Sequence, residues 1–239
     1  MENISLLSEL AEKVGVSLSQ LQIKQFNRYY EMLIEKNKVM NLTAITDYEE
    51  VVYKHFVDSL SLIKVYDLSQ EKSVLDMGTG AGFPGIPLKI AFPSLSVTLL
   101  DSLNKRVVFL DEVIAELGLE GIKAVHGRAE DFAKNQDYRE NFDLCVSRAV
   151  AKLTTLAEYC IPYIKKEGYF IPYKAGNIDA EVDEAKKAIK VLGGNLEKVA
   201  VFQLPETDIE RSFVVIKKIN VTPKHYPRTA GKPGKEPII

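Results

Sequence analysis

The sequence predicts an α/β fold in which a doubly wound, mostly parallel sheet of seven strands closes with an antiparallel hairpin. Two observations support this fold class. From residue 73 onward, short β-rich runs alternate with amphipathic stretches of ten or more residues, which is the pattern of successive β-α units. Beyond residue 194, two β-rich runs follow each other with no helical stretch between them, so we expect them to pair as a hairpin.

The first 70 or so residues show helical spacing of their apolar side chains instead. A short helix should end near Gly15, and the capping pair Ser17 and Gln20 should begin a longer one. Asp47 and Glu50 repeat the capping pattern before a third helix that runs to about residue 65. We therefore expect a helical subdomain at 1–70, an α/β domain at 71–220 and a basic, extended tail at 221–239.

In the α/β domain, five parallel strands should precede the two strands of the hairpin. Their expected ranges are 73–77, 97–101, 122–126, 142–147, 168–172, 196–203 and 212–219. Ligands of such sheets bind at the carboxyl ends of the strands. The candidate site residues are therefore those that directly follow a strand.

Composition and charge exclude several classes of protein. Thirty-three acidic and 31 basic residues give a formal net charge of -2, so the overall field does not attract a polyanion and any nucleic-acid surface has to be local. No apolar run approaches the roughly 20 residues of a membrane-spanning helix, and the acidic amino terminus is unlike a secretory signal. We expect a cytoplasmic protein with no membrane partner and, because its two cysteines and three histidines lack ligand spacing, no metal.

The glycine-rich run LDMGTGAGFPG at 75–85 is the strongest functional signal. An apolar strand leads through Asp76 to Gly78, Gly80 and Gly82, which allow a tight turn and a close approach of the backbone to a nucleotide. Starting at Gly80, the run also satisfies the dinucleotide pattern GxGxxG, but the strand would then have to extend beyond Gly78 and would contain an acid. The pattern acid-x-Gly-x-Gly-x-Gly is typical of S-adenosylmethionine sites in Rossmann-like class I methyltransferases.

Two further acids follow the next strands. Asp101 ends the second strand, where a carboxylate accepts the ribose hydroxyls of a nucleotide; the alternative is that it caps the following helix. Ala129, Glu130 and Asp131 follow the third strand, where the adenine base should lie. Their alternative role is that of first-turn acids stabilised by the helix dipole.

The end of the fourth strand separates the classes of methyl transfer. Enzymes that methylate exocyclic amines typically carry Asn or Asp before Pro-Pro-aromatic here, whereas this chain has Ser-Arg-Ala at 147–149. Cys145 and Cys160 lack the Pro-Cys context of a cytosine-C5 nucleophile and should be reduced core residues. Guanine N7 has a free lone pair, so positioning and electrostatics suffice for its methylation. Arg148 is the candidate group that holds the methionine carboxylate or faces the target base.

Other basic residues and one histidine are weaker candidates. Arg128 and Arg211 are expected contacts for phosphate or base, and solvated surface arginine is the alternative for both. Lys224 and Arg228 lie in the basic tail, which either binds phosphates or only improves solubility. His55 falls on the apolar face of its helix, so we expect a core or interface histidine and assign no general base.

Five segments together resemble the glucose-inhibited division protein B family, also called RsmG, over nearly the whole chain. They are NLTAI from Asn41, HFVDS from His55, GTGAGFPGIPLKI from Gly78, RAED from Arg128 and SRAV from Ser147. The resemblance implies a methyltransferase that uses S-adenosylmethionine to modify N7 of one guanine in 16S ribosomal RNA of the small subunit, whose loss is associated with streptomycin resistance.

By the resemblance, the cofactor pocket is lined by Gly78, Phe83, Asp101, Ser102, Leu103, Ala129, Glu130 and Arg148, to which the glycine motif adds Gly80. Arg148 and Arg211 are the candidate catalytic residues. Arg128, Arg211, Lys224 and Arg228 are the candidate RNA contacts. The substrate is naked RNA, the small subunit or an assembly intermediate.

Two alternative functions stay open at this point. A nicotinamide-dependent oxidoreductase would use the Gly80 register together with Asp101. A non-catalytic RNA-binding protein would bind through its tail. Truncation after Ile219 should abolish function in that case but spare cofactor affinity in a methyltransferase.

Overall fold

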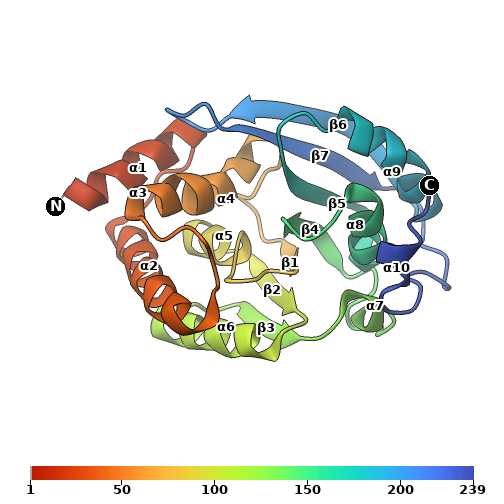
Figure 1. Ribbon diagram of the computed structural model, residues 1–239, viewed down its shortest axis with the longest axis horizontal. Helices are drawn as coiled ribbons and strands as arrows, with labels where there is room; N and C mark the ends of the chain where they lie inside the picture. Colours follow the sequence, from red (N-terminus) through yellow and green to blue (C-terminus); the bar gives the residue numbers. More distant parts are fainter. Residues whose placement is uncertain (1) are drawn as a thin grey trace.

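The computed structural model describes residues 2–239 and confirms the predicted sheet (Figure 1). The described residues form a seven-stranded sheet in the order β3-β2-β1-β4-β5-β7-β6. β1 to β5 pair in parallel, whereas β7 pairs antiparallel with both β5 and β6. The strands are β1 (Ser73–Met77), β2 (Ser96–Asp101), β3 (Ile122–His126), β4 (Phe142–Arg148), β5 (Ile164–Ala175), β6 (Gly194–Gln203) and β7 (Glu210–Lys218).

Helices cover both faces of the sheet, and each face has its own hydrophobic core. One core joins the N-terminal helices, α5 (Gly85–Ala91) and α6 (Asn104–Glu116) to the sheet. The other lies under α8 (Leu153–Cys160) and α9 (Asp179–Val191). Alternation of side chains along the strands explains the division, because Val74 and Leu75 point into opposite cores.

Two predicted elements differ from those observed. The connection after β3 holds only the four-residue helix α7 (Ala129–Phe132) and turns, not a helix of ten or more residues. β5 begins several residues before the predicted strand, because the segment after the 3-10 turn η3 (Ile161–Tyr163) already pairs with β4. The residues that connect β3 to α7 line one of the two cavities described below.

The N-terminal segment folds into successive helices that pack on the sheet. They are α1 (Glu2–Val14), α2 (Gln20–Met40), α3 (Tyr48–Val51), the π-helix η1 (Val52–Val57), α4 (Asp58–Leu60) and the 3-10 helix η2 (Ser61–Lys64). The predicted cap at Ser17 is wrong by two residues, because Ser19 and Gln22 form the capping box of α2. Asp47 caps α3 as predicted, accepting from Glu50 N at 3.0 Å.

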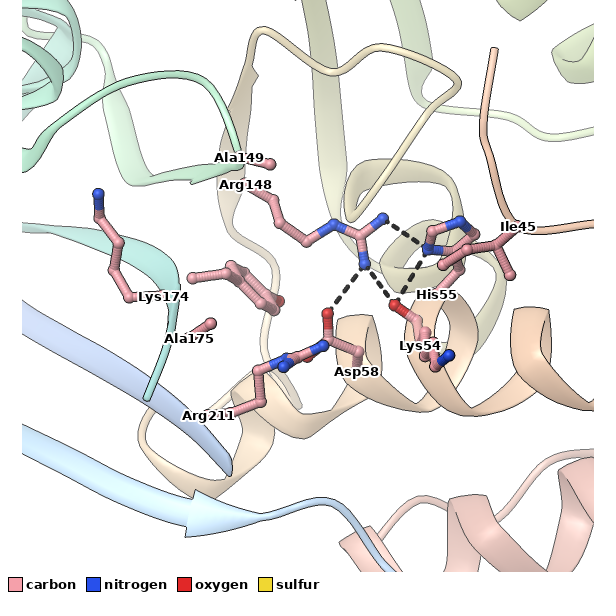
Figure 2. Close-up of a pocket in the computed structure, with 10 residues that line it drawn as sticks. Ile45, Lys54, His55, Asp58, Arg148, Ala149, Lys174, Ala175 and Arg211 are labelled. Atoms are coloured by element: carbon pink, nitrogen blue, oxygen red, sulfur yellow. Dashed lines mark hydrogen bonds and ion pairs between the residues drawn. The ribbon is translucent and has the colours of Figure 1, made fainter. Parts of the chain in front are cut away.

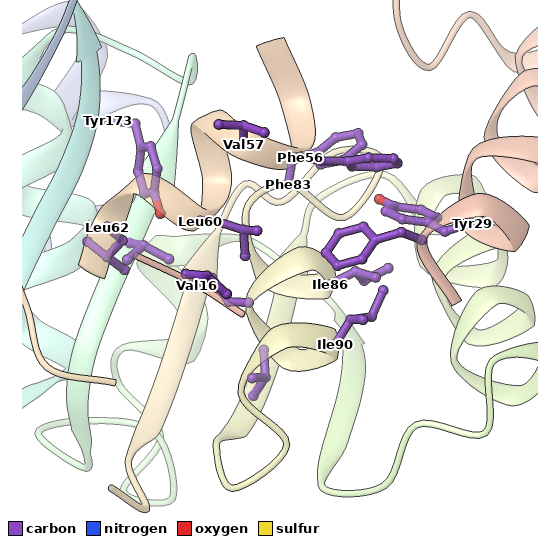
Figure 3. Close-up of a cluster of buried hydrophobic side chains, with 14 of the residues drawn as sticks. Val16, Tyr29, Phe56, Val57, Leu60, Leu62, Phe83, Ile86, Ile90 and Tyr173 are labelled. Atoms are coloured by element: carbon purple, nitrogen blue, oxygen red, sulfur yellow. The ribbon is translucent and has the colours of Figure 1, made fainter. Parts of the chain in front are cut away.

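The N-terminal helices contact the glycine-rich loop directly. Figure 3 shows Tyr29, Phe56 and Phe83 packed together, with ring centroids of Tyr29 5.8 Å from Phe56 and 5.3 Å from Phe83. The Tyr29 hydroxyl donates to the carbonyl of Ala81 at 2.6 Å. The helical segment at 1–70 therefore shares one core with the α/β domain and supports the loop from behind.

The tail is folded against the domain and ends near the short helix α10 (Lys232–Lys235), so the expectation of an extended tail is wrong (Figure 1). The Arg139 guanidinium donates to the carbonyls of Thr222, Pro223 and Tyr226 at 2.9, 3.3 and 2.9 Å. Both cysteines are buried and free. Over residues 2–239, no helix is long and apolar enough to cross a membrane.

Candidate cofactor and substrate site

Two cavities lie side by side at the carboxyl ends of the strands, separated by the segment that follows β4. Ala149 lines one cavity and Val150 lines the other. We call the first the arginine cavity and the second the loop cavity. The loop cavity has a volume of about 350 Å³ and is lined by Met77, Gly78, Leu100, Ser102, Leu103, Gly127, Arg128, Ala129, Glu130, Val150, Tyr159 and Gly231.

The glycine-rich turn forms the floor of the loop cavity. β1 ends at Met77, so the turn begins at Gly78 and the dinucleotide register from Gly80 does not directly follow the strand. Gly78 has φ +69°, and a Cβ at this position would lie 2.6 Å from Cγ2 of Val150. Only glycine therefore allows both the turn and the close approach at position 78.

The buried carboxylate of Asp76, on β1, holds this turn through two hydrogen bonds. Asp76 Oδ2 accepts from the Thr79 hydroxyl at 2.6 Å and from Gly85 N at 2.8 Å, which ties the beginning of the turn to the start of α5. Asp76 Oδ1 is buried and has no hydrogen-bond partner among residues 2–239. Burial of this half-satisfied group raises the pKa of Asp76 to about 6, against the effect of the two hydrogen bonds.

Asp101 fixes the turn from the side. Its carboxylate, 3% exposed, accepts from Gly80 N and Leu103 N at 2.9 Å each, and it pairs with Arg106 at 3.3 Å. The alternative that Asp101 caps α6 is wrong, because Leu103 is the N-cap residue and α6 has no side-chain cap hydrogen bond. Asp101 is not part of the cavity wall, whereas the adjacent Ser102 and Leu103 are.

The wall opposite the glycine turn comes from the first turn of α7. Glu130 is 6% exposed, lines the loop cavity, and accepts from Gly231 N at 2.9 Å through Oε1. Arg128 is exposed at the rim of the same cavity and has no ion-pair partner among the described residues. This wall therefore offers a fixed carboxylate inside the cavity and a free cation at its mouth.

The arginine cavity has a volume of about 370 Å³ and is shown in Figure 2. Its lining comes from the N-terminal helices and the ends of β4, β5 and β7. The lining residues are Ile45, Lys54, His55, Asp58, Arg148, Ala149, Tyr173, Lys174, Ala175 and Arg211. Of its four cations, Lys54 and Lys174 pair with Glu50 and Glu181 at 2.6 and 2.7 Å, whereas Arg148 and Arg211 share one carboxylate.

One buried carboxylate holds both arginines of this cavity (Figure 2). Asp58 is 2% exposed; its Oδ2 lies 2.9 Å from Arg148 Nη1 and its Oδ1 lies 2.8 Å from Arg211 Nε. Arg148 Nη1 also donates to the carbonyl of Lys54 at 3.0 Å. Because two guanidinium groups share one carboxylate, a net positive charge remains in the cavity and is available to an anionic ligand.

His55 is a neutral ring that orients Arg148. Its Nδ1 lies 3.2 Å from Arg148 Nη2, its Nε2 lies 3.0 Å from the Thr43 hydroxyl, and its ring stacks on Phe83 at 4.6 Å. The same Nδ1 lies 3.0 Å from the carbonyl oxygen of Lys54, so His55 contacts both the guanidinium of Arg148 and the carbonyl that this guanidinium also binds. Burial and the charge of Arg148 lower the pKa of His55 to about 3, so the interface role fits and a general base does not.

The structure brings most predicted site residues to the two cavities. Gly78, Ser102, Leu103, Arg128, Ala129 and Glu130 line the loop cavity, and Arg148 and Arg211 line the arginine cavity. Gly80, Phe83 and Asp101 lie behind these walls and support them. Lys224 is exposed on the tail, and Arg228 pairs with the buried Glu158 at 2.6 Å, so neither lines a cavity.

Several contributors to the two cavities were not predicted. Asp58 lies within the segment HFVDS that the resemblance rests on, but nothing in the sequence shows that it holds two distant arginines. Val150, Tyr159 and Gly231 come to the loop cavity from separate segments. Among the described residues, no group of three or more His, Cys, Asp or Glu side chains is placed to hold a metal ion.

Comparison with known proteins places the chain in a family. Residues 22–212 match the family model GidB, described as rRNA small subunit methyltransferase G. A protein of that name from Lachnoclostridium phytofermentans is 59% identical, with 95% of this chain and 93% of the relative covered. Another from Desulforamulus reducens is 53% identical, with 97% of each covered.

A solved structure supports the fold alone. M. jannaschii TYW2 in complex with AdoMet is similar with a TM-score of 0.51 and 16% identity, covering 63% of this chain and 71% of that one. The sheet order, the turn after β1 and the near full-length relatives agree with the resemblance found in the sequence. The chain belongs to the GidB family of rRNA small subunit methyltransferases G, whose members use S-adenosylmethionine as methyl donor.

Proposed function

We propose that this enzyme transfers the methyl group of S-adenosylmethionine to N7 of a guanine in 16S ribosomal RNA, within the small subunit or one of its assembly intermediates. The observation that carries the proposal is the pairing of two cavities across the segment 148–150. One cavity suits an adenosyl group. In the other, the one carboxylate pairs with two arginines, and the pKa of the one histidine is lowered to about 3. Ribosomal RNA is proposed as the acceptor because the relatives are ribosomal RNA small subunit methyltransferases.

The residues present fit the cofactor. Gly78 presents only main-chain atoms to the cavity, Ser102 and Leu103 lie where a ribose should bind, and Glu130 offers a carboxylate to the base. Arg148 offers its guanidinium to the methionine carboxylate. When bound, S-adenosylmethionine supplies a methyl group on a positively charged sulfur.

The chain's own groups then act by holding and orienting. Asp58, the Lys54 carbonyl and His55 fix the guanidinium of Arg148 on three sides, so it binds an anionic group without rearranging. Arg211 lies on β7 and is held by the same carboxylate. We assign it to the acceptor. Positioning of this kind is sufficient when the acceptor already has a free lone pair.

The absence of a required base agrees with N7 as the acceptor. In this transfer an N–C bond forms as an S–C bond breaks, the sulfur becomes neutral, and no proton moves. The ionisable side chains that line the arginine cavity are four cations, one ion-paired carboxylate, a tyrosine whose hydroxyl donates to the carbonyl of Ser59, and a histidine whose pKa is lowered to about 3. None of these is a base for removing a proton from an exocyclic amine.

Recognition of RNA has to be local because the formal net charge is -2. Arg128 at the loop cavity, Lys152 before α8 and Lys224 on the tail are exposed and have no ion-pair partner among residues 2–239. These free cations support contacts to phosphates around the cavities. The tail is fastened to the domain, so a protein whose tail alone binds RNA is not favoured.

The proposal is tested by transfer of labelled methyl from S-adenosylmethionine to RNA. Small subunits and deproteinised 16S RNA from cells that lack this protein serve as the two substrates, and the product is digested to nucleosides. We expect label in 7-methylguanosine, with the preferred substrate form showing whether ribosomal proteins contribute. Label in another nucleoside, or none with the cofactor bound, contradicts the assignment of N7.

A further inference from the structure

The carboxyl-terminal segment returns to the loop cavity and forms part of its wall. Gly231 lines the cavity although more than 100 residues separate it from the strand ends of β1 and β2. Figure 1 shows α10 beside α7 and α8, the helices that flank this cavity. The segment is therefore in a position to affect the cofactor that the family uses.

Arg228 anchors this segment to α8. Its Nε lies 2.9 Å from Glu158 Oε1 and its Nη2 lies 2.6 Å from Oε2, and its backbone N donates to Oε1 at 2.7 Å. Glu158 is 1% exposed, so the ion pair is shielded from solvent and has bidentate geometry. On the other side of Gly231, the Thr155 hydroxyl donates to the carbonyl of Pro233 at 3.3 Å.

Gly231 connects this anchor to the cavity carboxylate. It has φ +81°, and its N–H donates to Glu130 Oε1 at 2.9 Å. The second carboxylate oxygen, Oε2, has no hydrogen-bond partner among residues 2–239. A carboxylate with one oxygen fixed by a backbone donor has a defined orientation and keeps its other oxygen for a ligand.

We propose that residues 228–231 are a structural wall of the cofactor site and that Arg228 is a positioning residue for adenine recognition. Through the Gly231 N–H, Arg228 holds Glu130 so that Oε2 accepts from the 6-amino group of the adenine. The inference rests on the cofactor of the proposed function but not on N7 or on RNA. It revises one expectation: truncation after Ile219 removes this wall and weakens cofactor binding.

The test is calorimetric titration of the RNA-free protein with S-adenosylhomocysteine and with S-inosylhomocysteine, whose purine carries an oxygen instead of the 6-amino group. Arg228→Ala releases the anchor. Lys235→Ala is the control, because it also removes a cation of the tail, but one that is exposed and has no ion pair among the described residues. Arg228→Ala also leaves Glu158 buried without its partner, so the double variant Arg228→Ala/Glu158→Gln repeats the test without that buried charge.

We expect the unchanged protein and Lys235→Ala to bind the adenosyl compound at least tenfold more tightly than the inosyl compound. In Arg228→Ala and the double variant, the affinity for the adenosyl compound should fall about tenfold, because one hydrogen bond to a charged group is lost. The preference for the adenosyl over the inosyl compound should nearly disappear. Hydrogen exchange at the Gly231 amide should become faster. Unchanged affinity overturns the proposal, and so does an equal loss for both compounds, because a purely structural role keeps the preference.

Discussion

The two cavities are built in different ways, although they lie next to each other at the same end of the sheet. The loop cavity is formed mainly by short runs that directly follow β1, β2 and β3, and main-chain hydrogen bonds to Asp76 and Asp101 hold its floor. The arginine cavity is formed by side chains from four distant segments that meet around Asp58. Added atoms should therefore disturb the loop cavity most, and loss of a charged group should disturb the arginine cavity most.

The largest expected effect is on the floor of the loop cavity. In Gly78→Ala the new methyl group meets Val150 at 2.6 Å on a backbone with φ +69°, so we expect cofactor affinity to fall at least about 100-fold. Gly118→Ala is the control, since Gly118 also has positive φ (+60°) but open space around the Cβ and lies outside both cavities. Calorimetric titration measures both, and equal losses in the two variants contradict the role of close approach.

The next effect concerns the carboxylate at the centre of the arginine cavity. Asp58→Asn removes the charge shared by Arg148 and Arg211, so we expect the free energy of unfolding to fall by about 3 kcal/mol. Methyl transfer should fall about tenfold or more because both guanidiniums lose their orientation. Asp111→Asn, on the exposed face of α6, should change neither quantity. Denaturant unfolding and initial rates test the pair, and a stable, fully active Asp58→Asn protein rules out this arrangement.

The pH dependence of stability should also distinguish the two cavities. The pKa of Asp76 is raised to about 6 from 3.8, so its folded form holds the proton more tightly than its unfolded form. This contribution is complete below about pH 4 and is lost as pH rises through 6, by about 3 kcal/mol. Thermal unfolding should show the unchanged protein losing stability relative to Asp76→Asn between pH 4 and 7.

The contribution of His55, in the arginine cavity, to stability changes with pH in the opposite direction. Its pKa is lowered to about 3, so its contribution is complete above about 6.5 and is lost as pH falls. The unchanged protein should therefore lose stability relative to His55→Gln on acidification. A constant difference between protein and variant across this range, for either residue, contradicts the stated burial effect.

The smallest effect on stability is expected at Tyr29, which supports the glycine-rich turn from the N-terminal helices. Tyr29→Phe removes the buried hydrogen bond to the Ala81 carbonyl and should cost about 1–2 kcal/mol of unfolding free energy. Tyr30→Phe removes a similar bond to the carbonyl of Thr46 at the surface and should cost less than about 0.5 kcal/mol. Denaturant midpoints compare the two, and equal costs show that the Tyr29 bond does not support the glycine turn.

The difference between the two cavities also explains which features could be predicted from the sequence. The strands, their parallel order and the glycine turn follow from local patterns, and most of the loop cavity lies within a few residues of a predicted strand end. Asp58 could not be assigned because its partners Arg148 and Arg211 are 90 and 153 residues away, and only tertiary packing brings them together. The basic tail was misjudged for a similar reason, since the buried Glu158 that neutralises Arg228 looks like any helical glutamate.

The central claim is that the loop cavity and Arg148 bind the cofactor, while Arg211, which shares Asp58 with Arg148, serves the acceptor. Arg211→Gln tests it most directly, with affinity for S-adenosylhomocysteine and the rate of methyl transfer at saturating cofactor measured on the same preparation. We predict that the transfer rate falls at least about tenfold while the cofactor affinity changes by less than about twofold. A loss of cofactor affinity that equals the loss of rate contradicts the assignment of Arg211 to the acceptor.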